Sequence, residues 1–283
     1  MSAVRRPGRR HRREPVYAAT IGLGRVLLAG LDLTVRVGGL EHLPRSGPVL
    51  LASNHVSFGD FALLGRALLG AEHRVRFFCR RDVWGPAPVA RAMDAMGHVP
   101  VDRAAPAAAY LRGRALLRAG EVVCVFPEAG ISPSYVVRAL MPGAAALARE
   151  TGAALVPVTL WGGQRLWPQR RTATGPVPRP TPSRHRLVDV RLHPAVHVVP
   201  DADVVAVTRA LGHRLQSGLE DLQRLPEHQP PPGSRVPWHP AHLGGGGLER
   251  GASWALDRMP PGAVGPTWGP GLPPGAVRET MAP

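Results

Sequence analysis

The sequence predicts an α/β domain with a mostly parallel central sheet flanked by helices. Short β-like runs alternate along the chain with helical patterns, and each run is bounded by Gly or Pro. Alternation of this kind is typical of a parallel sheet that is covered by helices on its faces. The 283 residues, 44% hydrophobic and 19% charged, suit one globular domain with tails.

The expected elements follow one another along the chain. The β-like runs are residues 48–52, 75–79, 99–101, 122–126, 154–160 and 187–192. Helical patterns fall at residues 61–69, 87–96, 107–117, 142–151 and 204–225. Ligands of such sheets bind where the strands end and the loops begin, so the segments directly after the runs are where the chemistry is expected.

The N-terminal region carries six arginines between residues 5 and 13, followed by an apolar stretch over residues 16–35. Arg25 and Asp32 interrupt this stretch, so it lacks the long uncharged span of a transmembrane helix and an obvious signal-peptide cleavage site. We interpret it as a helix that lies in the plane of the lipid headgroups, with the arginines on anionic lipid. A core-packing helix behind a disordered basic arm is the alternative.

Composition divides the chain into three parts. We expect residues 1–14 to be a disordered basic arm and residues 15–225 to be the folded domain. From residue 226 to the end, 24 of 58 residues are Pro or Gly, without a repeat period. This fraction is typical of disordered segments, so residues 226–283 are predicted to be a disordered Pro/Gly-rich tail.

The formal net charge of +15 favours polyanionic partners, which include nucleic acid, anionic lipid headgroups and phosphorylated small molecules. All 35 basic residues are arginines, which bind phosphate with two donors at once, although a GC-rich genome would also replace Lys by Arg. The two cysteines, Cys79 and Cys124, have no Cys or His neighbours at metal-ligand spacing. We therefore expect neither a disulfide scaffold nor a metal site.

A histidine and an aspartate follow the first β-like run at a spacing of five residues. His55 and Asp60 flank a predicted strand-to-helix turn, where the carboxylate can orient the imidazole and stabilise its protonated form. Such a pair is a general base without a nucleophile of its own. The alternative is structural, because Ser57-x-x-Asp60 is also a capping box that opens a helix. A capping box accounts for neither Asn54 nor His55.

Two other segments place polar side chains after a run. Glu128 follows the run at residues 122–126 and could accept hydrogen bonds from a polyol, although an exposed loop glutamate is ordinary. Arg103 follows the run at residues 99–101 and could bind phosphate with its two-pronged guanidinium, although many other arginines are present.

Together, four blocks of this sequence resemble the glycerolipid acyltransferase family in their order and spacing. The blocks are Asn54-His55-x-x-x-x-Asp60, Gly97 to Arg103, Phe126-Pro127-Glu128 and Val156-Pro157-Val158. The resemblance implies a glycerol-phosphate acyltransferase-like fold and a peripheral enzyme on the cytoplasmic face of the cell membrane. It further implies acyl-CoA or acyl carrier protein as co-substrate, no cofactor, and a lysophospholipid acceptor such as 1-acylglycerol 3-phosphate.

The resemblance also implies roles for single residues. His55 would be the base and Asp60 its partner, while Arg103 and Glu128 would contact the phosphate-bearing acceptor. Asn54 and Gly130 complete the expected substrate-binding set. The family usually reads Pro-Glu-Gly-Thr-Arg in the third block, whereas this chain reads Pro-Glu-Ala-Gly-Ile-Ser over residues 127–132. The arginine that helps to hold the acceptor phosphate is missing, so another lipid or a glycolipid stays open as the acceptor, and nearby Arg138 is a possible substitute.

Other classes of function are compatible with parts of the sequence. Residues 165–191 hold seven arginines, with Trp161 and Trp167 at their start, and are typical of an interfacial lip that binds phosphate. The same stretch suits a nucleic-acid or anionic-lipid binding protein without catalysis, but no nucleic-acid motif accompanies it and we expect no nucleic-acid partner. A hydrolase could use the same His–Asp pair to activate water. Ser132 and Ser134 lack a G-x-S-x-G context, which disfavours a serine esterase.

Overall fold

The computed structural model describes residues 15–69, 74–169, 178–256 and 259–271. A seven-stranded sheet forms its centre, in the order β1-β7-β6-β2-β5-β3-β4. All neighbouring strands are parallel except β6 and β7, so the predicted mostly parallel α/β fold is confirmed. The strands are β1 (Thr34–Gly38), β2 (Val49–Ser53), β3 (Val75–Arg80), β4 (Val99–Val101), β5 (Val122–Val125), β6 (Ala154–Trp161) and β7 (Leu187–Leu192).

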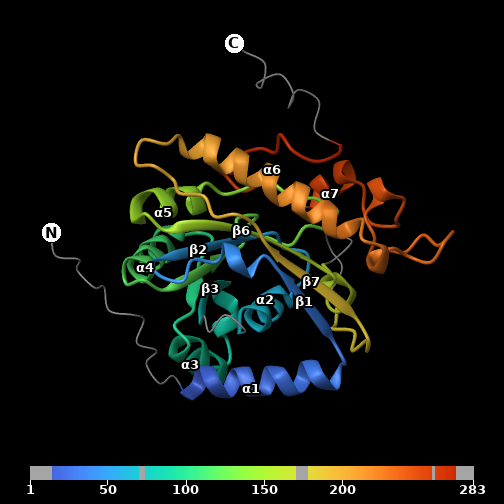
Figure 1. Cartoon of the computed structure of the whole chain (residues 1–283), viewed down its shortest axis with the longest axis horizontal. Helices are drawn as coiled ribbons and strands as arrows, with labels where there is room; N and C mark the ends of the chain where they lie inside the picture. Colours follow the sequence, from blue (N-terminus) through green and yellow to red (C-terminus); the bar gives the residue numbers. More distant parts are fainter. Residues whose placement is uncertain (1–14, 70–73, 170–177, 257–258, 272–283) are drawn as a thin grey trace, which may run out of the picture.

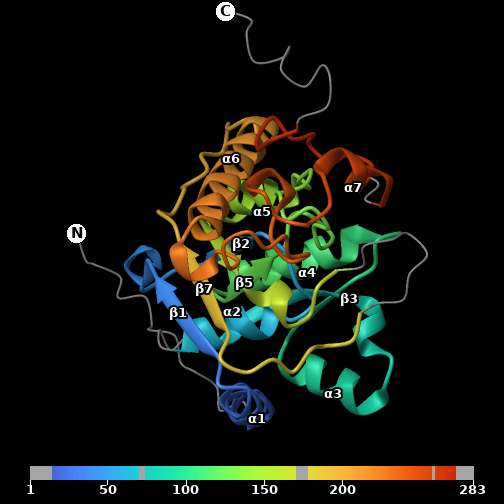
Figure 2. The same ribbon diagram turned by 90° about the vertical axis from the view of Figure 1, so that its right-hand side faces the viewer.

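Helices cover both faces of the sheet. One face carries α5 (Gly143–Thr151) and α6 (Val204–Gln223), and the opposite face carries α1 (Pro15–Gly30), α2 (Asp60–Leu68) and α3 (Ala87–Ala95) (Figure 1). Figure 2 shows the same separation, with α1 and α6 at opposite ends of the molecule. The helix α4 (Pro106–Arg118) contacts α5 and β4, and the short helix α7 (Arg250–Leu256) lies in the chain after α6.

All six predicted β-like runs are strands, and their bounds differ by one residue at most. The sequence pattern missed β1, of which only the first two residues fall in the apolar stretch over residues 16–35. That stretch divides into a helix and a strand, and Asp32, at a φ of 49°, lies in the turn between them. In β1, exposed and half-buried residues alternate, which is typical of an edge strand.

The core lies around the two central strands. Every residue of β2 and of β6 is buried. Continuous burial of this kind explains their unbroken apolar runs, because a parallel strand covered on both faces has no polar side. The polar residues that follow β2 therefore begin where the buried sheet ends.

The prediction for the end of the chain was wrong for the residues that the structure describes. Residues 226–256 and 259–271, which we call the C-terminal segment, are largely irregular but packed on the domain. Trp268 is 2% exposed and its indole N–H donates to the carbonyl of Val137 at 3.0 Å, while Val264 pairs with Leu140. A high Gly and Pro content disfavours regular elements, but a few large apolar side chains are enough to hold such a segment. Residues 1–14 and 272–283 lie outside the described residues.

The helix α1 is attached to the domain at its start. The hydroxyl of Tyr17 accepts from the backbone N–H of Val75 at 2.9 Å and donates to its carbonyl at 3.1 Å. Ile21 and Leu28 are partly buried against the domain, whereas Leu23, Val26 and Leu27 are 61%, 70% and 59% exposed. Among the described residues, no helix has both the length and the apolar character needed to cross a membrane.

Candidate active site

The candidate site lies at the carboxyl ends of β2 and β5. These strands are parallel neighbours, with Ala52 opposite Val125, so the segments that follow them leave the sheet side by side. His55 follows one strand and Phe126 follows the other, and their rings stack with centroids 4.2 Å apart. Two of the predicted blocks are thus brought together at the edge where ligands of parallel sheets bind.

The predicted His–Asp pair is formed. His55 Nδ1 lies 2.9 Å from Asp60 Oδ2, and the same oxygen accepts from the backbone N–H groups of Val56 at 2.8 Å and Ser57 at 2.9 Å. Asp60 is fully buried at the first position of α2. Three hydrogen bonds to one carboxylate oxygen fix its position.

The capping-box alternative is only half realised. Asp60 does accept from the backbone N–H of Ser57, as the motif requires. The N-cap residue of α2, however, is Gly59, and the hydroxyl of Ser57 accepts from the N–H of Gly59 at 3.0 Å rather than from within the helix. The motif therefore orders the turn and leaves the Asp60 carboxylate available to His55.

The imidazole of His55 has one nitrogen left for chemistry. Its Nδ1 donates to Asp60, so Nε2 is the acceptor of the neutral ring. No residue that the structure describes is hydrogen-bonded to Nε2, and the side chain is 19% exposed. A half-buried imidazole with an orienting carboxylate on one nitrogen and an open second nitrogen can act as a general base.

Glu128 lies in a different setting from an exposed loop glutamate. It is 1% exposed, and its Oε1 accepts from the backbone N–H of His55 at 2.7 Å. Its Oε2 accepts from the backbone N–H of Arg138 at 2.9 Å. The carboxylate thus joins the turn after β2 to the loop after β5 and fixes the backbone of the base.

Asn54 also makes contacts within the protein. It is fully buried, and its amide nitrogen donates to the carbonyl of Leu160 at 3.0 Å. Its amide oxygen accepts from the N–H of Leu160 at 2.7 Å. This paired contact holds the turn after β2 to the neighbouring strand β6.

Two guanidinium groups border the turn at Ala129 and Gly130. Arg103 Nη2 donates to the carbonyl of Ala129 at 2.7 Å. A side chain on Gly130 would collide with the guanidinium of Arg138, which shows that this arginine packs over the glycine. The structure therefore gathers Arg103, Gly130 and Arg138 beside Glu128, and the sequence alone could not show the direction of Arg138.

One residue of the site has no recognisable signal in the sequence. Gly163, in the turn η4 (Gly163–Arg165) after β6, packs on the carboxylate of Asp60. A Cβ at this position would lie 2.8 Å from Asp60 Oδ1 and 3.0 Å from Leu63. Oδ1 is buried without a hydrogen-bond partner among the described residues, so the backbone of Gly163 covers it.

The basic stretch over residues 165–191 is only partly a surface feature. Trp161 is fully buried, and Trp167 packs on Phe58 with ring centroids 5.5 Å apart. Arg165 is half-buried and contacts the carbonyl of Leu187 at 2.9 Å. A stack of bases on Trp161 is thus excluded, which removes part of the argument for nucleic-acid binding. Residues 170–177 lie outside the described residues.

Residues 34–161 match the model of the acyltransferase family. This chain is 33% identical over 138 residues to a chloroplastic 1-acyl-sn-glycerol-3-phosphate acyltransferase of Arabidopsis thaliana. It is 32% identical over 136 residues to a chloroplastic 1-acyl-sn-glycerol-3-phosphate acyltransferase of Brassica napus. Each match covers 47% of this chain, which spans 38% of the length of either relative.

The fold is similar to that of a solved acyltransferase. The crystal structure of the 1-acyl-sn-glycerophosphate acyltransferase PlsC from Thermotoga maritima superposes with a TM-score of 0.61 at 20% sequence identity. The alignment covers 76% of this chain and 84% of that chain. The glycerol-phosphate acyltransferase-like fold implied by the four sequence blocks is therefore confirmed.

Proposed function

We propose that the protein transfers a fatty acyl group from acyl-CoA or acyl carrier protein to the hydroxyl of a lysophospholipid such as 1-acylglycerol 3-phosphate. The observation that carries the proposal is the pair of His55 and Asp60 at the carboxyl ends of the central strands, with Nε2 open. The family match over residues 34–161 and the names of the relatives support the same reaction.

The reaction needs one proton relay. The acceptor hydroxyl gives its proton to Nε2 of His55 while its oxygen attacks the thioester carbonyl. The resulting imidazolium is stabilised by the buried carboxylate of Asp60. When the tetrahedral intermediate collapses, the carbon–sulfur bond breaks and the leaving thiolate takes the proton from Nε2. The ester forms without an acyl-enzyme.

The charge that develops on the carbonyl oxygen requires donors. Most backbone N–H groups around His55 already have acceptors within the protein, including those of Val56, Ser57 and Ser132. The N–H groups of Gly130 and Ile131 make no hydrogen bond to any residue that the structure describes. We assign these two groups as candidates for binding the oxyanion.

The acceptor is assigned from the charge beside the turn. The guanidinium groups of Arg103 and Arg138 border Ala129 and Gly130, next to the base, and favour an acceptor that carries a phosphate. Because Arg138 packs over Gly130, it is positioned to supply the positive charge that the altered third block lacks. A glycolipid or another uncharged acceptor is the alternative.

The test is acyl transfer from a labelled long-chain acyl-CoA or acyl carrier protein to a panel of lysophospholipid, glycerol-phosphate and glycolipid acceptors. Wild type and His55→Ala are compared side by side, with His197→Ala, an exposed histidine, as the matched control. Acceptor-dependent transfer that disappears only in His55→Ala supports the proposal. Thioester loss without an acceptor identifies a hydrolase, and no turnover with any protein overturns the enzymatic assignment.

We further propose that the protein binds the cytoplasmic face of the membrane peripherally through α1. The exposed Leu23, Val26 and Leu27 project from this helix, and Arg25 beside them suits anionic headgroups. Flotation of the protein with anionic vesicles tests membrane binding. Replacement of Leu23 and Leu27 by Glu should abolish this flotation. Flotation that survives this change contradicts the role of α1.

A further inference from the structure

We propose that the C-terminal segment is part of the catalytic apparatus, because His228 and Arg250 hold the two loops that fix Asp60 and His55. Both would be positioning residues, since neither touches the imidazole of His55. The inference rests on the proposed function, with His55 as the base. It concerns residues outside the range 34–161 that matches the family.

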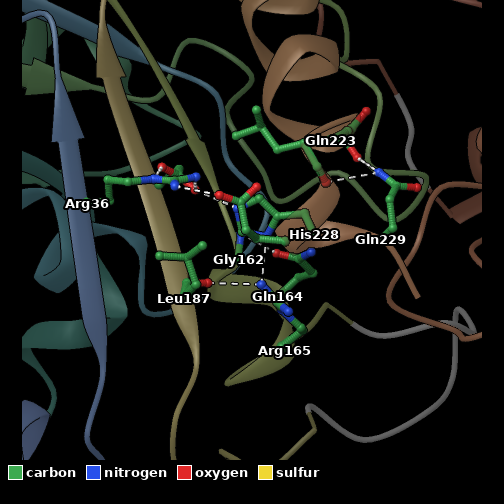
Figure 3. Close-up of polar contacts among 11 residues, drawn as sticks. Arg36, Gly162, Gln164, Arg165, Leu187, Gln223, His228 and Gln229 are labelled. Atoms are coloured by element: carbon green, nitrogen blue, oxygen red, sulfur yellow. Dashed lines mark hydrogen bonds and ion pairs between the residues drawn. The ribbon is translucent and has the colours of Figure 1, made fainter. Parts of the chain in front are cut away.

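The first contact is made by His228, which is fully buried in the turn η5 (Pro226–His228) directly after α6. Its Nε2 lies 2.7 Å from Asp189 Oδ2 and its Nδ1 lies 2.7 Å from Arg165 Nη2 (Figure 3). A guanidinium can only donate, so Nδ1 accepts and the proton of the neutral ring is on Nε2, facing Asp189. His228 therefore connects β7 with the turn that holds Arg165.

The position of His228 is itself fixed. The side chain of Gln229 donates to the carbonyl of Gln223 at 2.7 Å and to that of Leu225 at 3.2 Å. Figure 3 shows Gln229 beside the end of α6, with His228 directed toward Arg165. The turn η5 is thus attached to the end of the long helix.

Arg165 connects His228 to the turn that covers the catalytic carboxylate. It closes η4, the same turn in which Gly163 covers Asp60 Oδ1. Its guanidinium also stacks over the ring of Trp238, 5.0 Å from the centroid, and the carbonyl of Trp238 accepts from Gln164 at 3.4 Å. Two residues of η4 are therefore held by the C-terminal segment, and the third lies against the carboxylate that orients the base.

The second contact is made by Arg250, which is 6% exposed. Its guanidinium donates to the carbonyls of Trp268 at 2.7 Å, Pro270 at 3.0 Å and Val137 at 3.3 Å. The first two acceptors lie in the C-terminal segment, whereas Val137 lies in the loop after β5. Arg250 thus joins the segment to that loop.

This loop leads directly to the base. The residue after Val137 is Arg138, whose backbone N–H donates to Glu128, and Glu128 accepts from the backbone N–H of His55. Burial lowers the pKa of Arg250 to about 10, and the negative charge of Glu128 opposes this lowering. The buried cation therefore compensates the buried carboxylate that fixes the backbone of His55.

The two contacts lead to one catalytic pair through separate loops. His228 acts on Asp60 through η4, and Arg250 acts on His55 through Glu128. A displacement of about 1 Å in a catalytic group can cost on the order of 100-fold in rate, so loss of either contact should lower kcat. KM should change little, because neither residue lies where the acceptor is expected to bind.

The test separates the two hydrogen bonds of His228. His228→Asn can retain an acceptor toward Arg165, His228→Gln can retain a donor toward Asp189, and His228→Leu removes both. The expected order of kcat is wild type, then His228→Asn, then His228→Gln and His228→Leu, with a loss of about tenfold or more in the last two. The proposal is overturned if all three variants fold and have the same kcat as wild type. His197→Leu is the control, since this histidine is exposed.

A double-mutant cycle distinguishes positioning from general support of the fold. If His228 acts through Asp60, the loss caused by His228→Leu should shrink to less than about twofold in an Asp60→Asn background. The same should hold for Arg250→Met in a Glu128→Gln background, with exposed Arg224→Met as the control. If the loss of kcat in each double mutant equals the product of the losses in the two single mutants, the segment only stabilises the fold. This result overturns the proposal.

A readout without activity keeps this inference separate from the proposed function. Amide hydrogen exchange should speed up over residues 162–167 and 53–60 in His228→Leu, while the protein remains folded by circular dichroism. If wild type transfers no acyl group, the proposed function fails and the exchange experiment still tests the contact. Exchange that is unchanged in both peptides overturns the role of His228.

Discussion

Among the described residues, two His–Asp pairs with a buried carboxylate have nearly the same geometry but different uses. His55 Nδ1 lies 2.9 Å from Asp60, and His228 Nε2 lies 2.7 Å from Asp189. The side chain of His55 is 19% exposed with one nitrogen open, whereas His228 is 0% exposed and Arg165 occupies its second nitrogen. A base requires a carboxylate on one nitrogen and access to the other, so only the first pair can move a proton to or from a substrate.

The carboxylates also differ in their other partners. Asp60 accepts from two backbone N–H groups, which fix it within its own turn. Asp189 accepts from the guanidinium of Arg36 at 2.5 and 2.9 Å, which joins β7 to the edge strand β1. Burial alone would raise the pKa of Asp189, but the hydrogen bonds from His228 and Arg36 lower it below the ordinary value. The second pair therefore acts as a structural ion cluster.

The largest difference between the pairs should appear when the catalytic carboxylate is made neutral. Asp60→Asn keeps the shape of the turn but loses the charge that stabilises protonated His55, so kcat should fall by about 10²–10⁴-fold. Steady-state kinetics with the acceptor found active for wild type measures this. A variant that retains more than half of the wild-type kcat would mean that Asp60 only caps α2.

A smaller loss of kcat should follow when Gly163, which covers the carboxylate of Asp60, is replaced. In Gly163→Ala the added methyl would lie 2.8 Å from Asp60 Oδ1, so the carboxylate must move and kcat should fall about tenfold. Gly143→Ala is the matched control, because a Cβ there meets nothing within 4 Å. Equal kinetics of the two variants would show that the pair tolerates this displacement.

The structural pair should respond in stability rather than in rate. Asp189→Asn should cost about 1–3 kcal/mol of unfolding free energy at pH 7, because hydrogen bonds to a charged group are weakened. Asn can still accept from His228, so kcat should change far less than in Asp60→Asn. Since the folded pKa of Asp189 is lowered, its contribution is present above pH about 4 and is lost as the pH falls through the folded value. Urea denaturation of both proteins across this range measures the difference, and a constant difference contradicts the assignment.

The smallest predicted effect concerns the pH dependence of stability at a third histidine, His98, which has no carboxylate partner among the described residues. The nitrogen Nδ1 of His98 accepts from the backbone N–H of Phe77 at 3.2 Å, and burial together with the charge of Arg76 lowers its pKa to about 4. The unfolded chain, with a histidine pKa of about 6.5, binds more protons between these values, so stability should fall as the pH falls from 6.5 to 4. His98→Asn keeps an acceptor without a titrating proton, and should lose less stability than wild type over this range. Thermal unfolding at several pH values measures this difference, and an equal loss of stability in wild type and His98→Asn would contradict the prediction.

Much of the fold and part of the site could be predicted from local patterns. Each strand of the central sheet appears as an apolar run between Gly and Pro residues, and only the half-exposed edge strand β1 was missed. The His55–Asp60 pair was predictable because five residues separate its members within one turn. The packing of residues 226–256 and 259–271 was not predictable, because Gly and Pro content describes the backbone and not the contacts of single residues such as Trp268.

The sequence by itself determined the alternation of strands and helices and the local pair that forms the base. The tertiary structure alone decided that Glu128 holds the backbone of His55 across 73 residues of chain, and that Gly163 covers Asp60. It also decided which histidine is open and which is enclosed, since His228 meets Asp189 only after β7 and the end of α6 are packed together. The physical reason is that periodicity and short spacings depend on neighbours along the chain, whereas burial and long-range hydrogen bonds depend on the order of the strands in the sheet.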